Sequence, residues 1–219
     1  MLTFLNDPTM FQLLGILGTL FAILGSLVSA IAYKGKQAER YSPLNHFISE
    51  LGEVGVSRLA WVFNLGLIMC GLCLLPACII LGLILPGFWA KVGLAAGVVT
   101  AIGLSLVGVF PMNDLKPHGK AAVTFFRGGL VMVLAFTLAI AFQPKASQIL
   151  PPLVSLVGLP AILAFSGFLF MMFKASKDAE RGSLEPMENE RPKVWLMPMV
   201  EWAIFITIVL WFVAIAIAL

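Results

Sequence analysis

The sequence has 219 residues, of which 60% are hydrophobic and only 11% are charged. A soluble protein of this length carries more charge on its surface, whereas continuous apolar runs of 18 or more residues are typical of membrane-spanning helices. The net charge of +3 is too small to predict a nucleic-acid partner. Because the apolar runs are continuous and do not alternate, they argue against a transmembrane β-barrel. We therefore predict an all-α integral membrane protein, a six-transmembrane-helix bundle in which residues 1–219 form a single domain.

Six apolar segments each have about the twenty residues needed to cross the roughly 30 Å of a bilayer core. Short polar stretches and stretches with Pro and Gly, such as "LPGFW" at 85–89, separate them. In chain order, the predicted spans are Phe11–Tyr33, Leu59–Leu83, Ala90–Phe110, Ala121–Phe142, Leu150–Phe173 and Val194–Leu219.

Lysine and arginine are concentrated in alternate loops. The opposite side of the membrane has only Lys91 and Lys145. Because cytoplasmic loops carry an excess of Lys and Arg, we predict that loops one, three and five lie in the cytoplasm and both termini outside. The basic residues of those three loops are Lys34, Lys36, Arg40, Arg58, Lys116, Lys120, Lys174, Lys177, Arg181, Arg191 and Lys193.

Three polar residues lie about two turns inside their spans, on the side of the basic loops. They are Asn64 in the second span, Arg127 in the fourth and Glu201 in the sixth. Because a charge inside the bilayer is costly, we predict that Arg127 and Glu201 form an ion pair completed by Asn64. The pair would either lock two helices together or form a headgroup site for a phospholipid, with Ser49 and Glu50 nearby. A third alternative is that Arg127 reaches the interface alone.

A second cluster is predicted where loops one and three meet. Residues 45–53 are expected to form a short amphipathic helix in the membrane interface, with His46 and Glu50 on one face. Loop three adds Asp114 and His118, although Pro117 argues against these two sharing one regular helical turn. Two imidazoles and two carboxylates can bind a divalent metal or act as acid and base on a lipid ester. The alternative is that both histidines face solvent.

Small residues recur at the spacing that allows helices to approach closely, as at Gly18/Ala22, Gly25/Ser29 and Gly93/Gly97. We expect these residues to pack helices within the bundle, with a homodimer through one such face as the alternative.

Three stretches resemble a family of prokaryotic six-helix membrane proteins of unknown function. They are "NHFISELG" at 45–52, "FNLGLI" at 63–68, and "GVFPMND" at 108–114 with "HG" at 118–119. The similarity covers roughly residues 10–173, and the family is distantly similar to the Frag/DRAM/Sfk superfamily. The resemblance implies a six-helix bundle in the inner membrane of a prokaryote and a link to lipids. It places Ser49, Glu50, Asn64, Pro111 and His118 at motif positions.

Three functions follow from these observations. The first is a lipid-interacting membrane protein without catalysis. The second is an accessory or assembly subunit of a larger membrane complex, including pigment- or quinone-containing complexes. The third is an intramembrane lipid hydrolase that uses the predicted His and carboxylate residues. The chain contains no "HExxH" and no "GxSxG" motif, which favours the two non-enzymatic functions over the hydrolase.

Overall fold

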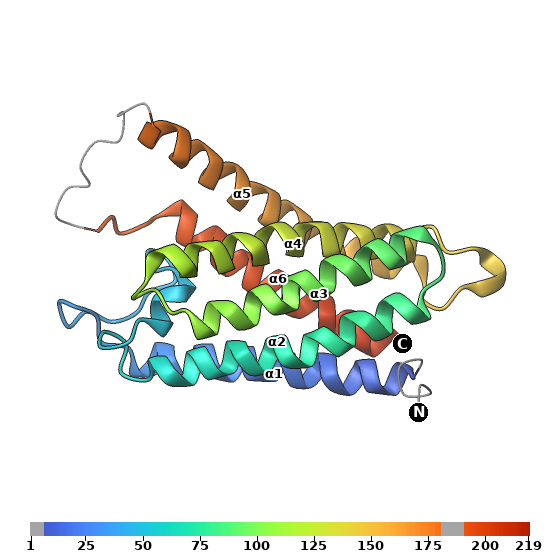
Figure 1. Ribbon diagram of the computed structural model, residues 1–219, viewed down its shortest axis with the longest axis horizontal. Coiled ribbons are helices and arrows are strands. Elements are labelled where there is room, and N and C mark those ends of the chain that lie inside the picture. Colours follow the sequence, from blue (N-terminus) through green and yellow to red (C-terminus); the bar gives the residue numbers. More distant parts are fainter. Residues whose placement is uncertain (1–6, 181–190) are drawn as a thin grey trace.

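The computed structural model describes residues 7–180 and 191–219. Six α-helices in this part of the chain are long and apolar enough to cross a bilayer, and five of them lie side by side along the long axis of the molecule (Figure 1). The predicted all-α, six-helix membrane fold is therefore confirmed. The helices are α1 (Pro8–Ala32), α2 (Ala60–Ile84), α3 (Phe88–Val109), α4 (Leu115–Ala141), α5 (Gly158–Glu180) and α6 (Leu196–Ala218).

Helix α4 begins at Leu115, earlier than the predicted start at Ala121. Asp114 is its N-cap, and its side chain accepts a hydrogen bond of 3.3 Å from the backbone N–H of Lys116. Pro117 lies in the first turn, where backbone N–H groups have no partner within the helix. The N–H of His118 donates to the Asp114 carbonyl at 3.1 Å. The expectation that Asp114 and His118 do not share a turn is therefore wrong.

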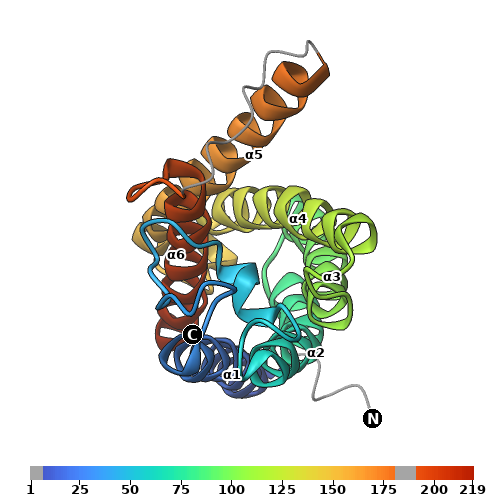
Figure 2. The same cartoon turned by 90° about the vertical axis from the view of Figure 1, so that its left-hand side faces the viewer.

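Helix α5 also differs from its predicted span, Leu150–Phe173. A 3₁₀ helix, η4 (Pro152–Val157), precedes it, and α5 itself continues to Glu180. Its C-terminal end leans away from the other helices (Figures 1 and 2). The buried apolar side chains Ala161, Phe165 and Phe168 accordingly lie in its first half.

The other five long helices are arranged in a ring, which the first half of α5 completes by packing against both α4 and α6. Seen end-on, α1, α2, α3, α4 and α6 surround a central space (Figure 2). A 3₁₀ helix, η2 (Ile48–Gly52), lies in the middle of the ring at one end. Leu51 is fully buried there. The prediction of an amphipathic helix in the membrane interface is therefore wrong, because the apolar side chains of this segment pack inside the bundle and not against lipid.

Helices α1 and α2 approach closely through small residues. A side chain at Gly25 would lie 3.2 Å from the Val62 carbonyl oxygen and 3.3 Å from the Cα of Gly66. Ser29 donates to the Leu59 carbonyl at 2.9 Å. The prediction that small residues pack helices within the bundle is confirmed for this pair, and the homodimer stays a prediction.

The basic loops gather at one end of the bundle, as predicted. The connection from α1 to α2 contacts the connection from α3 to α4, because Val54 exchanges two hydrogen bonds of 2.8 Å with the Asn113 side chain. The segment before α6 lies at the same end, where the Trp195 N–H donates to the Leu44 carbonyl at 2.8 Å. The start of α1 and the end of α6 lie at the opposite end (Figure 1). Arg181 lies outside the described residues.

Candidate functional site

A narrow cavity runs along the axis of the helix ring. It has a volume of about 90 Å³ and is lined by the five ring helices and η2. Its lining extends from His118 to Met132 on α4 and from Phe63 to Cys78 on α2. At 1.5 Å per residue, each stretch is about 20 Å long. The residues that line the cavity therefore follow the bundle axis over about 20 Å, and the cavity between them is narrow.

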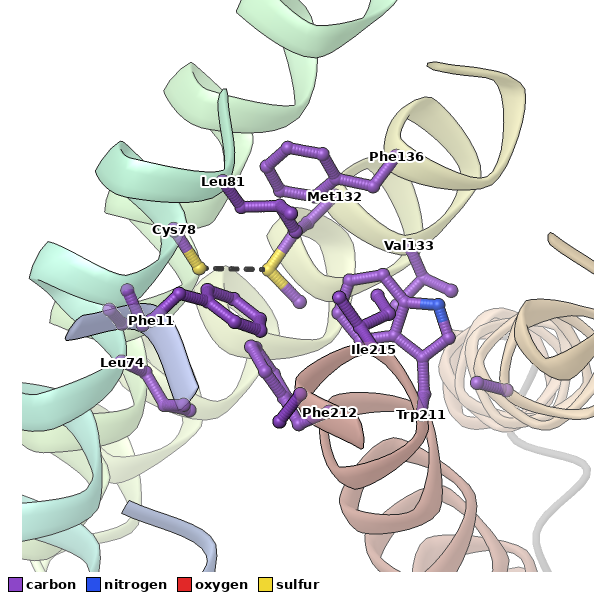
Figure 3. Packing of buried hydrophobic residues seen from close by; sticks show 14 of the residues in the cluster. Phe11, Leu74, Cys78, Leu81, Met132, Val133, Phe136, Trp211, Phe212 and Ile215 are labelled. Atoms are coloured by element: carbon purple, nitrogen blue, oxygen red, sulfur yellow. Dashed lines mark hydrogen bonds between the residues drawn. The ribbon is translucent and has the colours of Figure 1, made fainter. Parts of the chain in front are cut away.

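Apolar side chains pack tightly between the start of α1, the middle of α4 and the end of α6 (Figure 3). The rings of Phe11 and Phe212 stack with centroids 6.4 Å apart, and Trp211 meets Phe212 edge-on at 4.9 Å. The Cys78 thiol donates to the Met132 sulfur at 3.6 Å. This region presents only apolar and weakly polar groups to the cavity.

The opposite end of the cavity is polar, because Ser49, His118 and Glu201 line it. Glu201 is only 7% exposed, and its Oε2 accepts a hydrogen bond of 2.8 Å from the Ile48 N–H. His118 is 8% exposed, with its Nδ1 2.7 Å from the Phe110 carbonyl oxygen. A carbonyl oxygen only accepts, so Nδ1 carries a hydrogen, and Nε2 of the neutral ring is an acceptor.

Residues 45–54, which we call the plug, cover this polar end. Asn64 holds the plug against α2 by donating to the Gly52 carbonyl at 3.0 Å. Ser49 contacts loop three, where its hydroxyl lies 3.2 Å from the Met112 sulfur. A side chain at Gly52 would collide with Asn64 and lie 2.9 Å from the Phe63 ring, so only glycine fits at this close approach.

The plug is also tied to the segment that leads into α6. Arg191 donates to both carboxylate oxygens of Glu50, at 2.8 and 2.9 Å, and to the Asn45 carbonyl at 2.9 Å. The hydrogen bond with Glu50 raises the pKa of Arg191. Glu50 also accepts from the Phe47 N–H at 2.9 Å, at the start of η2. A two-pronged bond of this kind fixes both partners in orientation as well as in distance.

His46 lies in an aromatic cluster beside the plug and is only 3% exposed. Its ring centroid is 5.5 Å from that of Tyr33 and 5.2 Å from that of Tyr41. Trp202 donates to the Tyr41 hydroxyl at 2.8 Å, and that hydroxyl donates to the Phe47 carbonyl at 3.0 Å. Burial raises the pKa of Tyr41. Both histidines of the chain are thus buried, so the alternative that they face solvent is wrong.

The predicted ion pair between Arg127 and Glu201 is not formed within the described part of the chain. Arg127 is exposed on the outer side of α4, while its neighbour Phe126 is buried. Glu201 instead bonds to the plug backbone at Ile48. The depth argument identified Glu201 and Asn64 correctly as buried groups, but depth does not tell which side of a helix a residue faces.

The predicted metal set is also not brought together. Among the residues that the structure describes, no group of three or more His, Cys, Asp and Glu could hold a metal ion. Glu50 pairs with Arg191, and His118 with a backbone carbonyl. Asp114 is an exposed helix cap, and Nε2 of His46 is 3.9 Å from Glu39. Loops one and three do meet, but through Asn113 and Met112.

Some residues of the site were absent from the sequence prediction. Arg191 was expected only as a marker of topology, and Tyr41 had no predicted role. The one signal for Arg191 is the acidic side chain of Glu50 in an otherwise apolar segment, because a buried carboxylate needs a partner.

Together, these features define a six-helix membrane protein with a plugged cavity that is apolar at one end and polar at the other. The chain belongs to the family described as "Protein of unknown function (DUF998)", whose model matches residues 16–218. No curated protein and no solved structure matches the chain. A six-helix family of unknown function was expected from the resemblance, whereas the link to the Frag/DRAM/Sfk superfamily stays a prediction.

Proposed function

We propose that this protein binds a single-chain amphiphile within the membrane and does not act on it chemically. The apolar chain would occupy the cavity, and the polar head would lie beside Ser49, His118 and Glu201. The observation that carries this proposal is the lining of the cavity, which is almost wholly apolar but includes the buried hydrogen-bonding groups of Ser49, His118 and Glu201 at the plug end. Amphiphile sites have this arrangement because apolar walls bind the tail while a few polar groups orient the head.

The dimensions of the cavity favour one chain over two. Its volume of about 90 Å³ is several times the roughly 10–15 Å³ that a single water needs. Spread along a lining of about 20 Å, that volume is too small for two chains, and a single chain has to widen the cavity when it binds. This favours a single-chain ligand over the two-chain phospholipid expected from the sequence.

Binding is favoured over hydrolysis by the partners of the polar groups. An activated serine needs a hydrogen bond to its base. Here the Ser49 hydroxyl contacts the Met112 sulfur, and His118 Nδ1 contacts the Phe110 carbonyl. Glu201 bonds to the backbone of the plug. These contacts hold the plug and orient the imidazole, which is the arrangement expected of a binding site.

Two matched substitutions on α3 test this proposal. Ala101 is buried and lines the cavity at mid-depth, whereas Ala95 is exposed on the outside of the same helix. Leucine at position 101 fills part of the cavity, so Ala101→Leu should reduce the bound amphiphile by about tenfold. Ala95→Leu should leave binding unchanged.

Native mass spectrometry of the protein in mild detergent measures the bound mass, before and after addition of 16-carbon amphiphiles. Equal occupancy in both variants would place the ligand outside the cavity. A wild-type protein that takes up none of these amphiphiles would refute the proposal.

A further inference from the structure

We infer that the head of the ligand is a hydroxyl or an amine, and that phosphate and carboxylate heads are excluded. This inference rests on the proposed function, because it concerns the polar end of the same cavity. It names the class of ligand from the hydrogen-bonding groups that the cavity offers.

The polar end is rich in acceptors. The Phe110 carbonyl holds the hydrogen of His118 on Nδ1, so Nε2 of the neutral ring can only accept. Glu201 contributes a buried carboxyl group, of which the Ile48 N–H occupies one oxygen. Ser49 directs its hydroxyl hydrogen toward the Met112 sulfur, which leaves its oxygen lone pairs as acceptors. A head that donates hydrogen bonds fits these three groups.

The polar end also lacks a fixed positive charge among the described residues that line it. Arg191 is engaged with both oxygens of Glu50. Arg127, Lys116 and Lys120 are exposed on α4 and do not line the cavity. Burying a phosphate or a carboxylate without a cationic partner is costly, and the carboxyl group of Glu201 would add repulsion whenever it is charged.

This assignment differs from the site expected from the sequence. That expectation placed an anionic or zwitterionic head beside Arg127, on the assumption that this side chain faces the bundle interior. Because Arg127 faces outward, we infer that the buried site favours a hydroxyl or amine head over an anionic or zwitterionic one.

A chain-matched series of ligands tests the inference on the full-length protein in mild detergent. The four probes are hexadecanol, hexadecylamine, palmitate and hexadecyl phosphate, measured by competition in native mass spectrometry. We expect hexadecanol and hexadecylamine to bind at least tenfold more tightly than the two anions. Equal or tighter binding of hexadecyl phosphate or palmitate would overturn the inference and leave the proposed function standing. If none of the four binds, the proposed function itself fails.

Two substitutions locate the head within the cavity. His118→Asn keeps an N–H donor near the Phe110 carbonyl but removes Nε2, and should weaken hexadecanol binding by about tenfold. Glu201→Gln exchanges an acceptor for a donor, and should reduce the preference for hexadecanol over palmitate by a similar factor. Asp114→Asn, at the exposed cap of the same helix, is the matched control and should change neither value.

A melting curve of each variant shows whether it is folded, and Glu201→Gln stands as the test if His118→Asn does not fold. Unchanged preference in folded variants would place the head elsewhere and overturn the inference.

Discussion

At the scale of single residues, the contact between Arg191 and Glu50 joins the plug to the segment before α6. The Glu50 side chain is 8% exposed, and that of Arg191 is 37% exposed. The partial exposure of Arg191 weakens the electrostatic part of the interaction, because water screens it. The two parallel hydrogen bonds remain specific to a guanidinium group, since lysine presents a single ammonium group.

We expect Arg191→Lys to destabilise the protein by about 1 kcal/mol, because the charge is kept but the two-pronged geometry is lost. The corresponding decrease in melting temperature is about 2–4 °C for a chain of this size. Thermal unfolding in detergent, followed by intrinsic tryptophan fluorescence, measures it. Lys193→Ala is the control in the same segment, because Lys193 is exposed. Identical melting of Arg191→Lys and the wild type would show that the pairing does not stabilise the fold.

The sequence predicted correctly how deep the polar residues of α2 and α6 lie in the bundle. It did not predict which side of its helix Arg127 faces. Asn64 and Glu201 were expected inside the bundle because polar residues in apolar spans are costly, and both are buried. Arg127 was expected beside them at the same depth, but it lies one position from the buried Phe126 and faces outward. One residue turns a helix by 100°, so direction depends on which neighbours pack against it. A single sequence does not give those neighbours.

At the scale of elements, the plug determines how the polar end of the cavity is closed. It is short and 3₁₀-helical, yet Leu51 within it is fully buried. The hydrogen bond from Asn64 to the Gly52 carbonyl holds it against α2. The plug therefore depends on the close approach of its backbone to α2 at Gly52.

Gly52→Ala should loosen the plug, because the added methyl group meets Asn64 and lies 2.9 Å from the Phe63 ring. Overpacking of this kind costs roughly 1–3 kcal/mol. Hydrogen exchange followed by mass spectrometry should show faster exchange over residues 45–57 than in the wild type.

Gly119→Ala is the matched control, because nothing lies within 4 Å of a side chain at that helical position. This control should exchange as the wild type does. Unchanged exchange in Gly52→Ala would mean that the plug tolerates a wider separation from α2.

The long helices could be predicted from the sequence, whereas the plug could not. Six apolar runs of bilayer length predict six spans directly, and the observed boundaries differ from the prediction mainly where Asp114 caps α4 and where η4 precedes α5. Residues 45–53 have apolar side chains that suit either a lipid surface or a protein interior. The pattern alone does not distinguish these environments. The cavity that the plug covers is formed by five helices from across the whole chain, and a single sequence does not show that these helices meet around the plug.

At the scale of the whole molecule, the two ends of the bundle differ in charge and in closure. The plug end holds Lys34, Lys36, Arg58, Lys116 and Arg191. The other end holds Lys91, in the first turn of α3, and Lys145, between α4 and α5. The positive-inside rule therefore favours an orientation with the plug toward the cytoplasm and both termini outside. In this orientation, the polar end of the cavity faces the cytoplasmic leaflet.

Fusions to the C-terminus of the full chain test this orientation in a bacterial host. Alkaline phosphatase is active only outside the cytoplasm, so its fusion should be active. The corresponding fusion to green fluorescent protein should be dark, because that protein does not become fluorescent after export in an unfolded form. A bright fluorescent fusion with an inactive phosphatase fusion would contradict the orientation, and would place the plug on the outer side.

The hydrogen bond between the plug and α6 can form only late in the synthesis of the protein. The Ile48 N–H and the Glu201 carboxyl group that accepts its hydrogen bond are 153 residues apart. At a translation rate of about 5–20 residues per second, the plug emerges roughly 8–30 s before its last partner is made. During that interval the ring is still open where α6 will pack. The final helix therefore completes the fold, and a nascent chain arrested before α6 would expose an unfinished polar surface to the quality-control proteases of the membrane.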